Sequence, residues 1–274
     1  MKENICLLIF VLLFTANLFA QDGVSSARWQ TNKVVTDGNN TEWAKPLNLY
    51  DAESGLLFTV ANDGKTLYFC FTSKDVRKTS KLMKAGWEIS ISSKEKKKKF
   101  DAAVIFPAVQ MINAPGKDQG IVQNNNPSLK EDIDLYKINL QTVKLTGFVS
   151  ANGDTPLHTT DKINIGVGAD SSQEITFEIA IPFKELFPEN NAELNEELTL
   201  GVTVNALKRP PQQGHSGEGD SFTTSANGRM GGGGRTGGGR RGGGGGSRSL
   251  ADAGDRSQLY SKVSFKQKFR LTSK

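Results

Sequence analysis

The stretch "LLFTVANDGKTLYFCFTS", residues 56–73, places two β-rich runs on either side of an Asp-Gly pair. Asp63 and Gly64 predict a tight hairpin, because the short turns that join antiparallel strands need positive φ angles, which glycine adopts readily. The flanking runs are rich in Leu, Phe, Tyr, Val and Thr, the residues that half-buried strands favour. The stretch therefore predicts an antiparallel strand pair, with Cys70 as a small buried apolar residue.

Similar runs, separated by Asn, Asp and Gly, extend from residue 33 to residue 205. They are "KVVTDG" (33–38), "WEISIS" (87–92), "KFDAAVIFP" (99–107), "IDLYKINL" (133–140), "VKLTGFVS" (143–150), "INIGVGA" (163–169), "EITFEIAIP" (174–182) and "LTLGVTVN" (198–205). Helix signals are few: residues 75–85 could form a short helix or a loop, and "PFKELF" (182–187) predicts one helical turn. We therefore expect an all-β fold, a two-sheet antiparallel β-sandwich of the jelly-roll or immunoglobulin-like kind with little helix.

The C-terminal residues return to the strand pattern after a segment poor in apolar groups. In "QLYSKVSFKQKFRL" (258–271), strict alternation predicts a half-buried strand, with one face formed by Leu259, Ser261, Val263 and Phe265. Within residues 229–248, twelve residues are glycine and five are arginine. We expect residues 210–257 to be a disordered Gly/Arg-rich loop between the last strands, because a long surface loop costs little closure entropy.

The chain opens with "MKENICLLIFVLLFTANLFAQDG", a weakly positive start followed by an apolar run and then Ala20 before polar residues. This layout predicts a cleaved signal peptide over residues 1–20, and the apolar run is too short to span a bilayer comfortably. We expect residues 21–274 to form a single exported domain, periplasmic, cell-surface or extracellular, that does not span a membrane. Its remaining cysteine, Cys70, leaves stability to a hydrophobic core.

The net charge of +5 equals the charge of the five arginines in the glycine tract, since Lys2 and Glu3 cancel. The rest of the expected domain is formally neutral, whereas a nucleic-acid-binding domain carries basic residues on its folded surface. The tract also lacks aromatic residues that could stack on bases. We therefore expect no nucleic-acid partner, while weak attraction of the tract to an anionic polysaccharide or lipid surface stays open.

The lysines of "ISSKEKKKKFDAAV" (91–104) lie at the tip of another expected hairpin. A solvated turn is the favoured interpretation, because runs of charge are usually exposed. A site for an anionic partner is the alternative.

The sequence carries no catalytic motif: there is no GxSxG, HExxH, CxxC or P-loop pattern. His158 and His215 have no neighbours at metal-ligand spacing. The acids Glu131, Asp132 and Asp134 do not amount to a glycosidase pair. We therefore expect a protein that is not an enzyme.

The segment "TDGNNTEW" (36–43) is rich in side-chain oxygens. Calcium takes six to eight oxygen ligands, so Asp37, Asn39 and Glu42 are candidate metal ligands. The favoured alternative is a turn in which Asp37 and Asn39 accept hydrogen bonds from their own backbone.

Aromatic rings provide the apolar surface on which sugars stack, and a polar handle where a hydroxyl or indole N–H is present. The candidates for ligand contact are Trp29, Trp43, Tyr50 and Tyr136. For each of them, packing is the competing interpretation. Trp87 shares a face with Ile89 and Ile91 in an expected strand and is assigned to the core.

The order of four motifs is similar to that of a known family. "VVTDGNNTEWAKP" (34–46) resembles the opening "DG…E…W" of family 9 carbohydrate-binding modules and their DOMON-like relatives. "LLFTVANDGKTLYFCFTSKD" (56–75) resembles their second hairpin, and "EITFEIAIPFKELF" (174–187) their late strand and turn; "LTLGVTVN" resembles the strand that follows. The resemblance covers about residues 33–205 and the final strand. It implies a two-sheet sandwich of the kind that accompanies glycan-degrading enzymes, several members of which bind sugars and calcium.

These observations predict an exported, non-catalytic protein like a carbohydrate-binding module, whose partner is a polysaccharide or oligosaccharide. The resemblance supports the fold more strongly than it supports the ligand, because proteins that share a fold can have different functions. The alternative is an envelope structural or interaction protein that uses the sandwich as a scaffold and the Gly-rich loop as a flexible contact. A third hypothesis, a haem-binding DOMON-like domain, needs His158 together with Met83 or Met111 as axial ligands.

Overall fold

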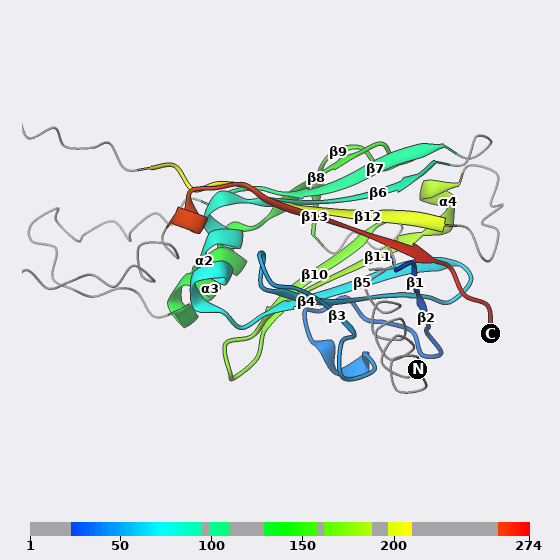
Figure 1. Ribbon diagram of the computed structural model, residues 1–274, viewed down its shortest axis with the longest axis horizontal. Coiled ribbons are helices and arrows are strands. Elements are labelled where there is room, and N and C mark those ends of the chain that lie inside the picture. The colour runs from blue at the N-terminus through cyan, green and yellow to red at the C-terminus, as the bar shows by residue number, and fades with distance from the viewer. Residues whose placement is uncertain (1–22, 95–98, 110–128, 158–161, 188–196, 210–256) are drawn as a thin grey trace, which may run out of the picture.

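Two β-sheets packed face to face form the body of the protein (Figure 1). The computed structural model describes residues 23–94, 99–109, 129–157, 162–187, 197–209 and 257–274. The expected fold class is confirmed: the chain is an all-β, two-sheet antiparallel sandwich with a few short helices.

The seven-stranded sheet has the order β1-β13-β12-β6-β7-β8-β9. Its members are β1 (Ser25–Ser26), β6 (Trp87–Ser93), β7 (Phe100–Phe106), β8 (Thr142–Thr146), β9 (Gly153–Pro156), β12 (Glu197–Val204) and β13 (Val263–Arg270). All of its pairs are antiparallel except the short parallel pair of β1 with β13.

The six-stranded sheet has the order β10-β11-β5-β4-β2, and β3 also pairs with β4. Its members are β2 (Arg28–Trp29), β3 (Leu49–Asp51), β4 (Leu56–Asn62), β5 (Thr66–Ser73), β10 (Asn164–Ala169) and β11 (Ile175–Pro182). The N-terminal segment passes from β1 in the first sheet to β2 in the second. Ala27, between them, is buried and donates its N–H to the carbonyl of Arg270 at 2.8 Å.

The hairpin predicted at Asp63-Gly64 is confirmed. Strands β4 and β5 pair as far as Asn62 opposite Leu67, and Gly64 has a φ of +84°. The carboxylate of Asp63 accepts hydrogen bonds from the backbone N–H groups of Lys65 and Thr66 at 2.9 and 2.8 Å. The turn is therefore fixed by a glycine conformation and by a side chain that bonds its own backbone.

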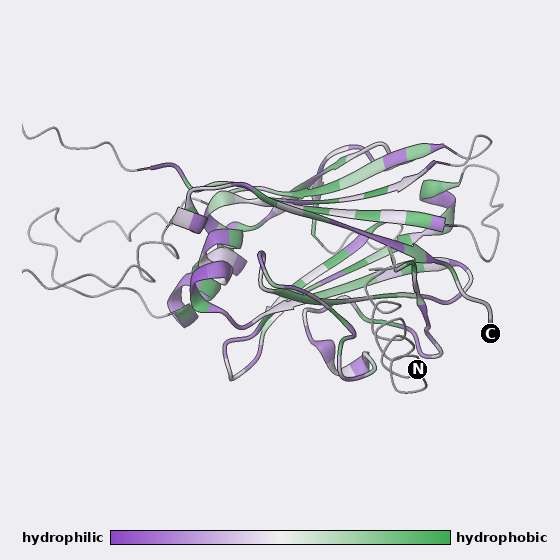
Figure 2. Ribbon diagram, in the orientation of Figure 1, coloured by the Kyte–Doolittle hydropathy of each residue, from purple (hydrophilic) through white to green (hydrophobic). Residues whose placement is uncertain are grey.

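Apolar and polar residues alternate along β6 and β13 of the seven-stranded sheet (Figure 2), whereas β5 and β11 of the six-stranded sheet are buried on both faces. The apolar faces meet between the sheets, where Trp87 occupies the centre of the core. Its ring stacks on Phe106 at a centroid distance of 4.6 Å and makes edge contacts with Phe71 and Phe177 at 5.5 and 4.8 Å. The assignment of Trp87 to the core is confirmed, and so is the burial of Cys70. Burial raises the pKa of the Cys70 thiol well above its ordinary value.

The described helices are short; α2 and α3 lie at one end of the sandwich and α4 at the other, whereas the 3-10 turn lies on the outer face of the six-stranded sheet (Figure 1). They are α2 (Val76–Ala85), α3 (Leu129–Asn139), α4 (Phe183–Leu186) and the 3-10 turn η1 (Asn40–Glu42). Residues 75–85, left open between helix and loop, form α2, whose first turn is capped by Asp75 accepting from the N–H of Lys78 at 2.9 Å. The helical turn predicted in "PFKELF" is confirmed as α4.

The strand expected at "IDLYKINL" (133–140) is wrong, because these residues belong largely to helix α3. The buried side chains of α3 are Leu129, Asp132, Ile133 and Tyr136, which recur at the three- and four-residue spacing of one helix face. The face that packs against the sandwich therefore follows the helical period.

The strand expected at "KVVTDG" (33–38) is also wrong, since these residues form no regular element. Gly38 turns the chain with a φ of +83°, and the turn lies directly against strand β10. A Cβ added at Gly168 would lie 2.3 Å from the carbonyl oxygen of Gly38, so glycine at this position permits backbone-to-backbone contact.

The last strand is confirmed, although it begins at Val263 and not at residue 258. Strand β13 pairs along its whole length with β12, and residues 257–259 form a single helical turn before it. The predicted signal peptide (1–20) and nearly all of the predicted Gly/Arg-rich loop (210–257) lie outside the described residues. Within the part of the chain that the structure describes, no helix is long and apolar enough to cross a membrane.

Candidate functional site

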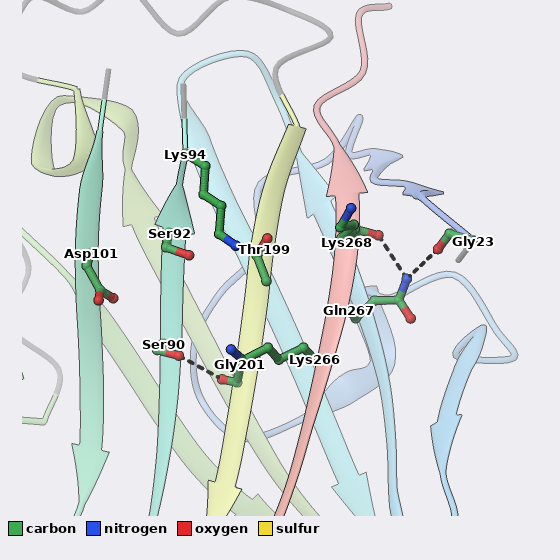
Figure 3. Close-up of a pocket in the computed structure, with 10 residues that line it drawn as sticks. All are labelled: Gly23, Ser90, Ser92, Lys94, Asp101, Thr199, Gly201, Lys266, Gln267 and Lys268. Carbon is green, nitrogen blue, oxygen red and sulfur yellow. Dashed lines mark hydrogen bonds between the residues drawn. The ribbon is translucent and has the colours of Figure 1, made fainter. Parts of the chain in front are cut away.

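A polar hollow of about 410 Å³ lies on the outer face of the seven-stranded sheet (Figure 3). Strands β6 and β12 form its floor, and β7 and β13 form its sides. Most inward side chains of these strands are apolar and fill the core, and the outward side chains of β6 and β12 form the floor of the hollow.

Strand register places the lining residues in two rows across the sheet. One row runs Lys266, Gly201, Ser90, and the next runs Lys268, Thr199, Ser92, Asp101. Every residue on β6 and β12 in these rows is a glycine, a serine or a threonine. The floor is therefore low because four small residues stand side by side on two adjacent strands.

Gly201 marks the centre of this floor. A Cβ added there would lie 2.4 Å from the hydroxyl oxygen of Ser90, and the Ser90 hydroxyl donates to the Gly201 carbonyl at 3.5 Å. The backbone of Gly201 is in an ordinary extended conformation, so other residues could adopt it. Its lack of a side chain leaves open space above the sheet.

Lysines border the hollow. Figure 3 shows Lys94 extending from the end of β6 toward Thr199, and Lys266 extending from β13 over Gly201. The ammonium group of Lys268 lies 3.4 Å from the carboxylate of Glu197. Among the described residues, neither Lys94 nor Lys266 forms an ion pair.

The outer edge of the hollow is closed by the N-terminal segment. The side-chain amide of Gln267 donates to the carbonyl of Gly23 at 2.9 Å and to that of Lys268 at 2.8 Å (Figure 3). Sequence reasoning missed this site. The signal for it was a set of small residues at the alternate positions 90 and 92 and 199 and 201, but sequence alone does not show that these two strands are neighbours.

A buried carboxyl group lies on the opposite face of the molecule, on the outside of the six-stranded sheet. Glu178 of β11 is fully buried beneath the turn that contains Gly38 and Trp43. The indole N–H of Trp43 donates to one carboxyl oxygen at 2.6 Å, and the backbone N–H of Gly38 donates to the other at 2.8 Å. Glu178 was also missed, although an acid in the middle of the apolar run "ITFEIAIP" was a visible signal.

The surroundings of Glu178 favour its neutral form. The pKa of Glu178 is raised from 4.5 to about 7, chiefly by burial, and the nearby charges of Glu42 and Asp37 act in the same direction. The hydrogen bonds from Trp43 and Gly38 lower the pKa, because they stabilise the carboxylate. This group titrates near neutral pH in the folded protein.

The candidate calcium ligands Asp37, Asn39 and Glu42 surround this turn. The Asp37 carboxylate accepts from the N–H of Asn39 at 2.7 Å, and the Asn39 side chain accepts from the N–H of Thr41 at 3.2 Å. These are the backbone-bonding roles that the sequence favoured over calcium ligation. One carboxylate oxygen of Glu42 is buried without a hydrogen-bond partner.

No group of three or more His, Cys, Asp or Glu among the described residues could hold a metal ion. Calcium binding therefore stays a prediction. For the haem hypothesis, Met83 is fully buried in the core, and His158 and Met111 lie outside the described residues.

The four candidate aromatic residues are not brought together. Trp29 is half-buried in β2 beside Gly64, and Trp43 is buried over Glu178. Tyr50 of β3 is 64% exposed, whereas Tyr136 of α3 is fully buried against Phe177.

Trp29 and Tyr50 do not form a pair of facing rings. Trp29 lies opposite Asn62 and Tyr50 opposite Leu57 on the same edge of β4. Since those partners are five positions apart, the two aromatic residues point to opposite faces of the sheet.

Comparison with known protein families and curated proteins identified no relative of this chain. The resemblance to family 9 carbohydrate-binding modules is a prediction that rests on the motifs of the sequence. No protein-family model matches the chain, and no curated protein matches it.

Proposed function

We propose that the protein is an exported, non-catalytic carbohydrate-binding module similar to those of family 9, and that it binds an oligosaccharide in the hollow on the seven-stranded sheet. The observation that carries the proposal is the hollow itself, a space of about 410 Å³ above a floor of Gly201, Ser90, Ser92 and Thr199. That volume lies within the range of about 300–1,000 Å³ typical of small-molecule sites.

The chemistry of the lining suits a sugar. Serine and threonine hydroxyls both donate and accept hydrogen bonds, as the hydroxyls of a sugar do. Lys94 adds a donor, and Asp101 adds an acceptor. Since none of the described residues in the lining is aromatic, recognition by them would depend on hydrogen bonds and charge and not on stacking.

Export is supported by the N-terminal sequence. The first residues have the layout of a signal peptide. Cys70, the cysteine that remains after removal of such a peptide, is buried in the sheet as a free thiol, and the apolar core between the sheets stabilises the domain instead of a disulfide.

Filling the floor of the hollow tests the proposal. The leucine side chain of the variant Gly201→Leu would occupy the space above β12 and exclude a sugar from it. Glycan affinity should fall at least tenfold, which corresponds to a binding free energy weaker by about 1.4 kcal/mol or more. The readout is a glycan array followed by calorimetry on the best ligand.

The matched control is Thr203→Leu, on the same strand and the same face but outside the hollow. This variant should bind like the unmodified protein. If the unmodified protein binds none of the plant, microbial and host glycans on the array, the sugar proposal is contradicted, while the description of the fold is unaffected.

The second candidate, an envelope interaction protein, is favoured by one feature. The segments that precede and follow residues 210–256 are bonded to each other: the N–H of Leu207 donates to the carbonyl of Leu259 at 3.0 Å, and Arg209 lies over the ring of Tyr260 at 5.8 Å. The intervening residues thus begin and end at one place on the surface. Deletion of residues 229–248 should leave sugar binding unchanged, but it should abolish partner binding if the glycine tract is the contact.

A further inference from the structure

We infer that the hollow selects an acidic oligosaccharide, with the anionic group of one sugar held between the ammonium groups of Lys94 and Lys266 over strand β12. This inference rests on the proposed function, because it names the ligand class of the same site. It develops the anionic-partner alternative that the lysine-rich hairpin left open.

The first argument is the balance of charge around the hollow. The described residues that line it carry three ammonium groups and one carboxylate, those of Lys94, Lys266, Lys268 and Asp101. Lys268 is compensated by Glu197 at 3.4 Å, and no described acid pairs with Lys94 or Lys266. Two positive charges that no described acid compensates therefore lie over neighbouring rows of the floor (Figure 3).

The second argument is the surface beneath those charges. Lys94 extends toward Thr199, and Lys266 extends over Gly201, two residues of β12 that point to the same face (Figure 3). Neither floor residue carries a charge, so an anion placed there meets two ammonium donors and a hydroxyl without a competing carboxylate. Hydrogen bonds between ammonium groups and carboxylates or sulfates are among the strong ones.

The third argument is the position of the Asp101 carboxylate, which lies on the side of the hollow away from the lysines of β13. Asp101 stands on β7, two strands away from β12, which is roughly 10 Å at normal strand spacing. Its carboxylate repels an anion but accepts hydrogen bonds from hydroxyls, and Ser92 of β6 lies between it and Thr199 in the same row. The hollow therefore fits an acidic sugar over β12 followed by a neutral sugar over β6 and β7.

The test compares acidic oligosaccharides with their carboxyl-reduced forms, which have the same size and no charge. The probes are tetrasaccharides of galacturonate, of mannuronate and of alternating glucuronate and N-acetylglucosamine, with a sulfated galactose tetrasaccharide as the arm that distinguishes sulfate from carboxylate. Calorimetry with the full mature chain should show at least one acidic probe binding about tenfold tighter than its reduced form. The alternating probe should bind more tightly than the galacturonate probe.

The variants Lys94→Gln and Lys266→Gln should each weaken acidic binding about tenfold, and added salt should weaken it in the unmodified protein. The matched control is Lys144→Gln, a lysine of β8 outside the hollow, which should change affinity by less than about twofold. Asp101→Asn should improve binding of the fully acidic galacturonate probe. An unchanged melting temperature shows that the variants remain folded.

The outcomes separate this inference from the proposed function. If acidic and reduced sugars bind alike, the hollow does not select for charge; if the lysine variants bind like the unmodified protein, their ammonium groups do not hold the ligand. Either result overturns the inference while glycan binding stands. If no sugar binds, both are overturned. Binding to phosphatidylserine vesicles without binding to any sugar would also overturn both, in favour of an anionic membrane surface.

Discussion

At the scale of single residues, the most unusual group is Glu178. A glutamate in the middle of an apolar strand is costly to bury in its charged form, yet here it is fully enclosed and accepts hydrogen bonds from Trp43 and Gly38. These hydrogen bonds tie the irregular segment 33–43 to the outer face of the six-stranded sheet. They also give physical meaning to the "DG…W" motif, because its glycine and its tryptophan are the residues that bond Glu178.

The titration of Glu178 predicts how stability depends on pH. Its pKa is about 7 in the folded protein and ordinarily 4.5, so between these values the folded state keeps a proton that the unfolded state has lost. The free energy of unfolding should therefore fall as pH rises from 4.5 to 7, by roughly 3 kcal/mol from this group, and then level off. Urea denaturation at pH values from about 5 to 8 measures the slope.

The variant Glu178→Gln provides the comparison, because it cannot ionise. Its pH profile should lack this descent, although its stability at any one pH also reflects the loss of one acceptor for the Gly38 N–H. The control Glu88→Gln changes an acid on the outer face of the other sheet and should keep the descent. Parallel profiles for the unmodified protein and Glu178→Gln would show that Glu178 does not titrate in this range.

At the scale of elements, helix α3 is a segment for which the prediction from sequence, a strand, was wrong. Residues 133–140 were expected to form a strand, which would place Ile133 and Leu135 on the same face. The helix instead buries Ile133 and leaves Leu135 37% exposed. The hairpins and the later strands were predictable because turn glycines and β-branched runs agree with each other. The helix was not, because its buried stripe is decided by its packing against the sandwich.

Alanine substitutions in α3 distinguish the two periodicities. Ile133→Ala should lower the free energy of unfolding by about 3 kcal/mol, the usual loss for a fully buried aliphatic side chain. Leu135→Ala should lower it by less than about 1 kcal/mol, because surface changes have small effects. Equal losses at the two positions, measured by chemical denaturation, would support the strand pattern and contradict the helix.

The candidate site illustrates the same limit on sequence reasoning. Trp29, Trp43, Tyr50 and Tyr136 were chosen by residue type, and the structure distributes them over separate places, two of them buried. The hollow consists of residue types that attract no notice singly, such as Gly201 and Ser90. Strands β6 and β12 lie far apart along the chain and become neighbours only through the sheet order β12-β6-β7. Long-range pairing of this kind leaves no local signal.

At the scale of the whole molecule, the sandwich is closed by its last strand. Strand β13 lies between β12 and β1 and carries Phe269 into the core, so the C-terminal residues are an integral part of the fold. The turn before β13 is held by helix α2: the ammonium group of Lys81 donates to the carbonyls of Gln258 and Ser261, both at 2.8 Å. Together with the hydrogen bond from the Leu207 N–H to the Leu259 carbonyl, these bonds join the ends of β12 and β13 independently of residues 210–256.

This arrangement predicts that residues 210–256 are dispensable for folding. Replacing them with a Gly/Ser linker of about six residues shortens the connection roughly eightfold, which should stabilise the protein by about 2 kcal/mol through reduced closure entropy. Thermal and urea denaturation of the shortened protein measure the gain. As a control, Lys81→Met removes both hydrogen bonds to the turn and should destabilise the shortened and the full-length protein by similar amounts. A shortened protein that is unfolded or less stable would show that the intervening residues, and not the hydrogen bonds at their two ends, hold β13 in the sheet.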